Sequence, residues 1–176
     1  MNVSDDIRIR QAEPADLGAV AEMHYGVWRR SWTGILTSPL LNLLGPPKRW
    51  VADVYPQTLN RPGWSMWIAE AGGRAVGVTI FGPDDDEPGS TQIDALYIAD
   101  DRQRRGTGGL LLDTVLRRSP STDVILWCAE QNAKARSFYE KNHFRADGRT
   151  LTWEPLPGIR VPHLGYRLTR PAVLSL

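Results

Sequence analysis

A glycine-rich turn occupies residues 103–109 and reads Gln103-Arg104-Arg105-Gly106-Thr107-Gly108-Gly109. It lies between an expected strand, 92–98, and an expected apolar helix, 107–118. Glycines let the backbone turn tightly and bring its N–H groups against an anion, and the start of the following helix adds partial positive charge. Arg104 and Arg105 can add charge-assisted hydrogen bonds. The pattern predicts a pyrophosphate-binding turn, although a plain glycine-rich turn with solvated arginines explains the same residues.

Two nucleotide-binding motifs compete for these glycines, and neither of them fits. A P-loop requires Gly-Lys followed by Ser or Thr, and the sequence contains no such triplet. A dinucleotide fingerprint requires a third glycine where Leu111 stands, and its strand should open a βαβ unit. The turn is therefore expected to bind a phosphate group in another structural context.

Outward from the turn, the hydrophobic pattern predicts strands interleaved with helices. Gly72-Gly73 is a hairpin signal between two strands, and Pro46-Pro47 breaks or restarts a helix that begins near Ser38. Strands are expected at 7–10, 65–70, 74–81, 92–98, 124–129, 144–154 and 163–168, and helices at 14–30, from 38, at 107–118 and at 133–141. This order predicts an α/β (α+β) fold, a mixed sheet with helices on its faces.

The composition is that of an ordinary globular protein. The 176 residues include 41% hydrophobic and 23% charged side chains, and the formal net charge of +1 gives no sign of a nucleic-acid-binding face. Cys128 is the only cysteine, and with three widely spaced histidines it makes no recognisable zinc site, so we expect no metal. Neither a secretory signal nor a bilayer-length apolar run is expected. We expect one cytoplasmic domain over residues 1–176, with its core at about 7–170, that contacts neither nucleic acid nor membrane.

A second motif lies downstream of the turn. Its members are Asn132, Ala135, Phe138, Tyr139, Glu140, Lys141 and Phe144. Together with Gln103, Gly106 and Gly108, this motif resembles the GNAT superfamily of N-acetyltransferases. In that family a Gln/Arg-x-x-Gly-x-Gly/Ala turn precedes Asn-x-x-Ala-x-x-Phe-Tyr-Glu-Lys-x-Gly-Phe. The family glycine falls at His143, after Asn142, and both residue types tolerate the left-handed conformation that ends a helix. For His143 a helix-ending role is favoured over that of a catalytic base.

The resemblance implies a GNAT-like fold. Its central sheet is mostly antiparallel, splays at two adjacent parallel strands and has helices on both faces. The resemblance also implies acetyl-CoA as co-substrate, with the diphosphate on the turn, the pantetheine arm along strand 96–98, and the thioester in a slot beside strand 125–129. The residues expected to contact acetyl-CoA are Leu96, Tyr97, Ile98, Gln103, Arg104, Arg105, Gly106, Thr107, Gly108, Gly109, Asn132 and Tyr139.

The reaction that the resemblance implies is transfer of an acetyl group to a primary amine by direct attack on the thioester. Tyr139 is the expected general acid, because a phenol with a pKa of about 10 is protonated at neutral pH and can donate to the leaving thiolate. Family members often place a glutamate where Gln92 stands, and an amide cannot accept the proton. Asp94, two residues on and on the same side of the strand, is the candidate base, although a hydrogen-bonding role fits it equally. The alternative to an enzyme is a non-catalytic acyl-CoA sensor; Asn132 and Tyr139 favour the enzyme.

The acceptor, a small-molecule or peptide amine, is expected on the other side of the slot. In the family, the segment linking the first two helices lines the acceptor pocket, and here Tyr25, Trp28 and Trp32, with Gln92, are the candidates for substrate binding. Trp28 and Trp32 share a helix face, which suits either an aromatic binding wall or core packing. The acidic run 84–87 fits either attraction of a cationic amine or a solvated loop. The acceptor, the acyl-chain preference and the oligomeric state, a homodimer included, stay open.

Overall fold

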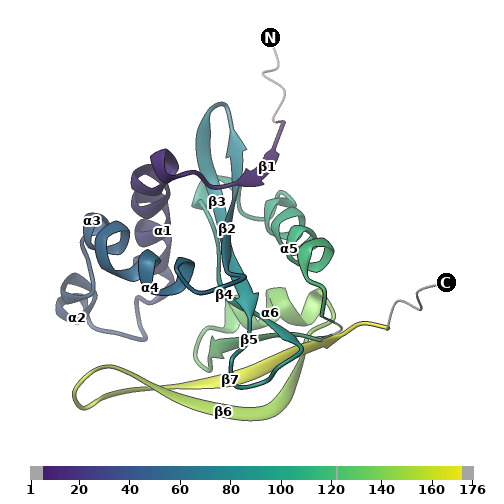
Figure 1. Ribbon diagram of the computed structural model, residues 1–176. Coiled ribbons are helices and arrows are strands. Elements are labelled where there is room, and N and C mark those ends of the chain that lie inside the picture. Colours follow the sequence, from purple (N-terminus) through teal and green to yellow (C-terminus); the bar gives the residue numbers. More distant parts are fainter. Residues whose placement is uncertain (1–5, 122, 172–176) are drawn as a thin grey trace.

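The computed structural model describes residues 6–121 and 123–171, which form one seven-stranded sheet with helices on both faces (Figure 1). The strands are β1 (Arg8–Gln11), β2 (Ser65–Ala71), β3 (Arg74–Pro83), β4 (Ser90–Ile98), β5 (Asp123–Ala129), β6 (Arg145–Leu156) and β7 (Ile159–Thr169). The helical elements are η1 (Pro14–Asp16), α1 (Leu17–Ser31), α2 (Ser38–Leu43), α3 (Pro47–Arg49), η2 (Trp50–Val54), α4 (Tyr55–Leu59), η3 (Asp100–Arg102), α5 (Thr107–Arg118) and α6 (Ala133–Lys141). The expected order of elements is confirmed, and α5 and α6 have the expected bounds.

The segment between α1 and β2 differs from the expectation in detail. Pro46-Pro47 does interrupt it, because proline at the first helical position starts a new helix rather than continuing the old one. The chain then runs through a π-helical turn, Trp50–Val54, before α4. Nothing in the local sequence predicted this turn. It buries Trp50 and leaves Val54 exposed, so one short element contributes both to the core and to the surface.

The strands follow the order β1-β2-β3-β4-β5-β7-β6. Within the described residues, β4 and β5 are parallel neighbours and the other neighbouring pairs are antiparallel. The parallel register joins Ser90–Ile93 to Asp123–Leu126 and ends there, although both strands continue. The two strands are thus paired at one end and apart at the other, and the expected splay is confirmed.

A β-bulge at Asp94 marks the point where β4 leaves β5. Ile80 of β3 pairs with Ala95 and Phe81 pairs with Ile93, so Asp94 is an extra residue in β4. A bulge bends its strand and increases the local twist. The bend therefore coincides with the separation of the two parallel strands, and it places a carboxylate at the opening.

Helices cover both faces of the sheet (Figure 1). On one face α1 packs on β3 and β4, and the core there includes Trp28, Trp50 and Ile80. On the other face α5 packs on β2, β3 and β4 and buries Leu111 and Val115. Both layers therefore pack on β4, which forms one side of the opening beyond Asp94.

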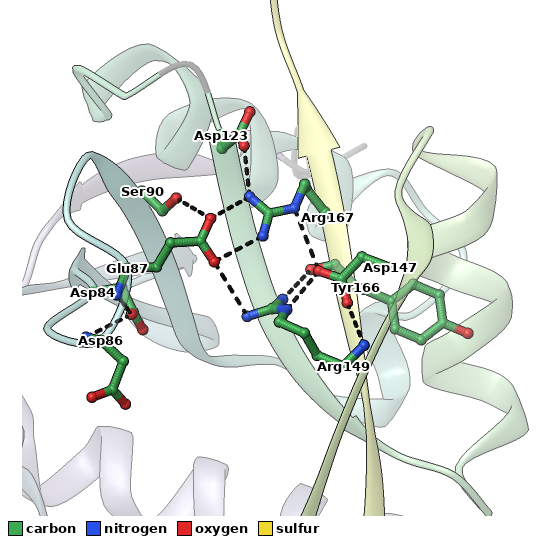
Figure 2. A network of polar contacts seen from close by, with 9 residues as sticks. All are labelled: Asp84, Asp86, Glu87, Ser90, Asp123, Asp147, Arg149, Tyr166 and Arg167. Atoms are coloured by element: carbon green, nitrogen blue, oxygen red, sulfur yellow. Dashed lines mark hydrogen bonds and ion pairs between the residues drawn. The ribbon is translucent and has the colours of Figure 1, made fainter.

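Ion pairs fasten the closed end of the splay, as Figure 2 shows. The Arg167 guanidinium of β7 donates to both carboxylate oxygens of Glu87, at 2.6 and 2.8 Å, and to Asp123 of β5 at 2.6 Å. Arg149 of β6 donates to Asp147 at 2.6 Å and lies 3.9 Å from Glu87. The Arg167 guanidinium holds the pKa of Glu87 near 2, well below its usual value. The cluster therefore ties the loop before β4 to β5, β6 and β7.

Candidate active site

A cleft of about 1010 Å³ opens where β4 and β5 separate. Its walls come from the glycine-rich turn and α6, from β4 and β5, from α1 and the segment 44–58, and from β6 and β7. Ten of the residues expected to contact acetyl-CoA line it: Leu96, Tyr97, Ile98, Gln103, Arg104, Gly106, Gly108, Gly109, Asn132 and Tyr139. Arg105 and Thr107 lie outside this lining.

The glycine-rich turn has the backbone shape that an anion site requires. Gly106 has φ +86° and is the N-cap of α5, and Arg104 also has a positive φ, +59°. The first hydrogen bond of the helix runs from the Leu110 amide to the Gly106 carbonyl, at 3.1 Å. The amides before Leu110 have no acceptor within the helix, since a helix leaves its first N–H groups unpaired. The turn therefore presents donors and a helix N-terminus to the cleft.

Two residues of the expected cofactor set hold the turn and α6 in place. Gln103 donates from Nε2 to the Ile98 carbonyl, at 2.9 Å, and to Asp100, at 3.1 Å, and it accepts from the Lys134 ammonium. Asn132 is the N-cap of α6, and its Oδ1 accepts from the Ala135 amide at 3.1 Å. Both residues also line the cleft. Gln103 therefore ties the turn to the end of β4, and Asn132 fixes the start of the helix that carries Tyr139.

Tyr139 lines the cleft from α6. Its ring is 8% exposed and packs edge-to-face on Phe138 and Phe144, with centroids 5.3 and 5.5 Å away. Burial, with smaller contributions from Cys128 and Tyr97, raises the pKa of its phenol well above the usual value. Within the part of the chain that the structure describes, its hydroxyl has no hydrogen-bond partner. The hydroxyl is therefore protonated and free to donate to a ligand.

Cys128 of β5 also lines the cleft. Burial raises the pKa of its thiol to about 11. A thiol with this pKa is protonated at neutral pH, and the thiolate is the nucleophilic form. Cys128 is consequently a poor candidate for a covalent intermediate.

Asp94 and Gln92 both line the cleft from β4. The Asp94 side chain reaches solvent through the open cleft, yet protein atoms surround it closely enough that desolvation raises the pKa of its carboxyl, while the Arg61 charge opposes that rise. A carboxylate with a raised pKa is a better proton acceptor at neutral pH than an ordinary aspartate.

The predicted acceptor residues separate into two groups. Trp28 and Trp32 line the cleft, with rings 5.7 Å apart. Tyr25 lies outside the lining: its hydroxyl donates to the Leu41 carbonyl at 3.3 Å, and its ring packs closely against Gly45. Contact between Tyr25 and the acceptor therefore stays a prediction, and the lining of the cleft does not support it.

Two histidines line the cleft and were missed by the sequence interpretation. His24 Nδ1 lies 3.0 Å from the Tyr55 hydroxyl, and burial lowers the pKa of its imidazole to about 3. His163 Nδ1 lies 3.0 Å from the Val161 carbonyl, which can only accept, so Nδ1 carries the proton and Nε2 stays an acceptor; burial also lowers the pKa of His163. The spacing of His24 from Trp28 could have revealed the first, whereas His163 comes close only through long-range strand pairing.

Tyr97 and Trp32 meet at the aromatic side of the cleft. Burial raises the pKa of the Tyr97 hydroxyl to about 12, and the nearby Trp32 indole N–H opposes that rise. The same indole N–H does not reach hydrogen-bonding geometry with any described residue. This side of the cleft therefore retains a buried donor whose bonding is incomplete.

The remaining polar candidates lie away from the cleft. The acidic run 84–87 does not line it: Glu87 is held by Arg167, and Asp85 pairs with Arg61 at 2.6 Å. His143 has φ +69°, so the left-handed end of α6 is confirmed. In the ranges 6–121 and 123–171, no group of His, Cys, Asp or Glu is arranged to hold a metal ion, and no helix is long and apolar enough to cross a membrane.

Comparison with known proteins agrees with this geometry. The model of the acetyltransferase (GNAT) family matches residues 31–144. "Probable N-acetyltransferase Rv2775" of Mycobacterium tuberculosis is 60% identical over 167 residues, which cover 95% of this chain and 96% of that protein.

Solved structures share the fold at low sequence identity. The PaiA N-acetyltransferase from Thermoplasma acidophilum, in complex with coenzyme A, is 18% identical with a TM-score of 0.67, over 93% of this chain and 99% of that one. The ribosomal-protein-S18-alanine N-acetyltransferase from Escherichia coli is 16% identical with a TM-score of 0.68, and the match covers 97% of this chain and 99% of that one. The family model and the relative from M. tuberculosis together show that this chain belongs to the GNAT family of acetyltransferases and is an N-acetyltransferase.

Proposed function

We propose that this chain transfers the acetyl group of acetyl-CoA to a primary amine within the cleft between β4 and β5, and that residues 1–176 act as one acetyltransferase domain. The observation that carries the proposal is that one cleft joins an anion-binding turn at Gly106 to the protonated, unpartnered hydroxyl of Tyr139. A thioester carrier with a charged diphosphate at one end and a reactive carbonyl at the other matches both features.

The charges along the cleft support this orientation of the co-substrate. Arg104, Lys134 and Lys141 are the cationic residues that line it, and they come from the turn and α6. Phosphate groups are favoured beside such charges and beside a helix N-terminus. Beyond Ile93, β4 has no pairing with β5, so its backbone can hydrogen-bond to an extended pantetheine arm as an edge strand does.

The reaction is a direct transfer with two proton movements. The neutral amine attacks the thioester carbonyl, so that a C–N bond forms while the oxyanion is stabilised by backbone N–H groups at the slot. The C–S bond then breaks, and Tyr139 donates its proton to the leaving thiolate. Asp94 accepts the proton that the amine loses. The protonated state of Cys128 supports direct transfer over an acyl-enzyme route.

The base requirement limits which amines react readily. A lysine amine with a pKa of about 10.4 must lose its proton against a gap of roughly three pKa units at pH 7, or about 4–5 kcal/mol, whereas an α-amine with a pKa near 8 loses far less. This cost is set by the pH and the pKa of the amine, so Asp94 can assist only the later transfer of the proton that the attacking nitrogen loses. We therefore expect the rate to rise with pH until the amine itself is neutral.

Calorimetry with acetyl-CoA, followed by thiol release with a panel of primary amines, tests the proposal. Binding with release supports it, binding without release with any amine identifies an acyl-CoA sensor instead, and no binding refutes it. Lys141→Gln, which removes a cation from the cleft, should weaken acetyl-CoA binding by up to about fivefold, or about 1 kcal/mol. Lys48→Gln makes the same change on α3, outside the cleft, and should leave the affinity unchanged.

A further inference from the structure

The two ends of the cleft differ in charge. Its cationic lining residues, Arg104, Lys134 and Lys141, belong to the turn and α6. The other end is built by α1, the segment 44–58 and the β6–β7 hairpin. Among the described residues, Asp94 is the only acidic side chain that lines any part of the cleft. Among the described residues that line the cleft, the acceptor end therefore offers one carboxylate for one amine and no second acidic side chain.

Aromatic rings form the wall of that acceptor end. Five of the seven tryptophans line the cleft: Trp28, Trp32, Trp50, Trp127 and Trp153. The ring of Trp28 packs on Trp50 at 5.5 Å, and the ring of Trp32 packs on Trp153 of the hairpin at 5.1 Å. His163 completes the group 5.9 Å from Trp32. These contacts hold the rings in place before any ligand enters, so the wall is preorganised for an apolar partner.

Apolar side chains also mark the mouth of the cleft. Val54 and Leu151 line it, and they are 42% and 43% exposed. The first lies in the π-helical turn and the second on β6, so the two approach the mouth from different elements. Because both residues line the cleft and remain exposed, they add apolar surface where the cleft meets solvent.

We propose that the acceptor is a monoamine whose substituent is aromatic or bulky and apolar, with this substituent against the Trp28, Trp32 and Trp153 wall and the amine at Asp94. The proposal rests on the acetyl transfer proposed above and narrows its substrate class. A ring fits such a wall through stacked and edge-to-face contacts.

Polycations are the main competing acceptors, and the structure disfavours them. Polyamines and aminoglycosides carry several positive charges, which require several carboxylates at the site. The nearest acidic run, 84–87, lies outside the lining, with Asp85 paired to Arg61 and Glu87 to Arg167. Burial keeps His24 and His163 neutral, so they neither repel nor neutralise an incoming amine.

The test compares phenylethylamine, butylamine and spermidine by thiol release, after acetyl-CoA binding has been measured by calorimetry. We expect kcat/KM to be at least about tenfold higher for phenylethylamine than for either other amine, as for a fitted apolar pocket. Equal or greater turnover of spermidine or butylamine would overturn the acceptor class while leaving the acetyltransferase function intact. Absence of acetyl-CoA binding, or of release with every amine, would overturn both.

Single substitutions test whether the aromatic wall causes the preference for phenylethylamine. Trp153→Leu should raise KM for phenylethylamine by about tenfold and change butylamine turnover by less than about threefold. Trp67→Leu is the matched control, because this partly buried tryptophan lies outside the cleft, and it should change neither. If Trp153→Leu does not fold, Leu151→Glu replaces it: residue 151 is exposed, and the new carboxylate should shift preference toward spermidine. Unchanged selectivity in a folded, acetyl-CoA-binding variant would overturn the proposed wall.

Discussion

Replacing Tyr139 by phenylalanine removes one oxygen atom from the lining of the cleft. The ring packs on Phe138 and Phe144, and this packing is unchanged in the variant. Because the hydroxyl has no hydrogen-bond partner among the described residues, its loss leaves no buried group unsatisfied. We therefore expect the free energy of unfolding to stay within about 0.5 kcal/mol of wild type.

The expected fall in kcat for Tyr139→Phe can be estimated from the surroundings of the phenol. General acids contribute about 10²–10⁴-fold to turnover. Burial raises the pKa of Tyr139 well above its usual value, so its proton is donated less readily to a thiolate and the lower bound applies. We expect kcat to fall about 100-fold, or about 2.7 kcal/mol in the activation barrier, while the Kd for acetyl-CoA changes little.

Single-turnover thiol release with a good acceptor, together with calorimetry for acetyl-CoA, measures both quantities. Tyr166→Phe is the control, since the Tyr166 hydroxyl donates to Glu140 at 2.9 Å and lies outside the cleft. This control should lose about 1 kcal/mol of stability and keep its turnover. A Tyr139→Phe enzyme that retains more than about a third of wild-type kcat would refute the assignment, because even the weakest general acid contributes far more.

Three further predictions follow from the base, the ion-pair cluster and a close backbone contact. Asp94→Asn should remove the lower of two acidic inflections in the pH dependence of kcat/KM and leave the upper one, which the amine sets. In wild type the lower inflection should lie above the ordinary aspartate pKa of about 3.9, because burial raises the pKa of Asp94. Glu87→Gln should flatten the acid dependence of Tm: Arg167 lowers the pKa of Glu87 from 4.5 to about 2, so its stabilisation is present above about pH 4.5 and is lost as the pH falls toward 2. Gly82→Ala should lower Tm by about 3–10 °C, because the added Cβ would lie 2.4 Å from the buried Trp64 ring.

Each of these has an outcome that contradicts it. An unchanged lower acidic inflection in Asp94→Asn would exclude the carboxylate as the base. Parallel Tm curves for Glu87→Gln and wild type between pH 5 and pH 2 would mean that the Arg167 pair adds nothing to acid stability. For Gly82→Ala the comparison is Gly18→Ala on α1, where a Cβ meets no atom within 4 Å; equal Tm values in the two variants would remove the steric explanation.

Much of the fold and of the cofactor side could be predicted from sequence because the information there is local. Glycines, helix caps and hydrophobic period lie within a few residues of one another, so the turn at Gly106 and the helix carrying Tyr139 were placed with their observed bounds. The left-handed end of α6 at His143 likewise follows from the tolerance of Asn and His for that conformation.

The acceptor side resisted prediction because it is assembled from distant segments. His163 reaches the cleft only through the pairing of β7 with β5, and Trp153 of β6 meets Trp32, the residue that caps the end of α1, only through a contact between distant segments. Tyr25 was expected beside Trp28 and Trp32 yet lies outside the cleft lining, because consecutive helix positions differ by about 100° in direction and local spacing alone does not show which of them face the cleft. The bulge at Asp94 is a property of the β3–β4 register, which local sequence does not encode.

The Arg167 cluster at the closed end of the splay (Figure 2) has a consequence for how such a protein can diversify. It anchors the base of the β6–β7 hairpin to β5 and to the loop before β4, and none of its ion pairs involves a side chain from the outer part of the hairpin. The outer part of the hairpin, which carries Leu151 and Trp153, could therefore be exchanged for that of a relative. Such a chimera would inherit a new substrate preference while the acetyl-CoA half kept its shape.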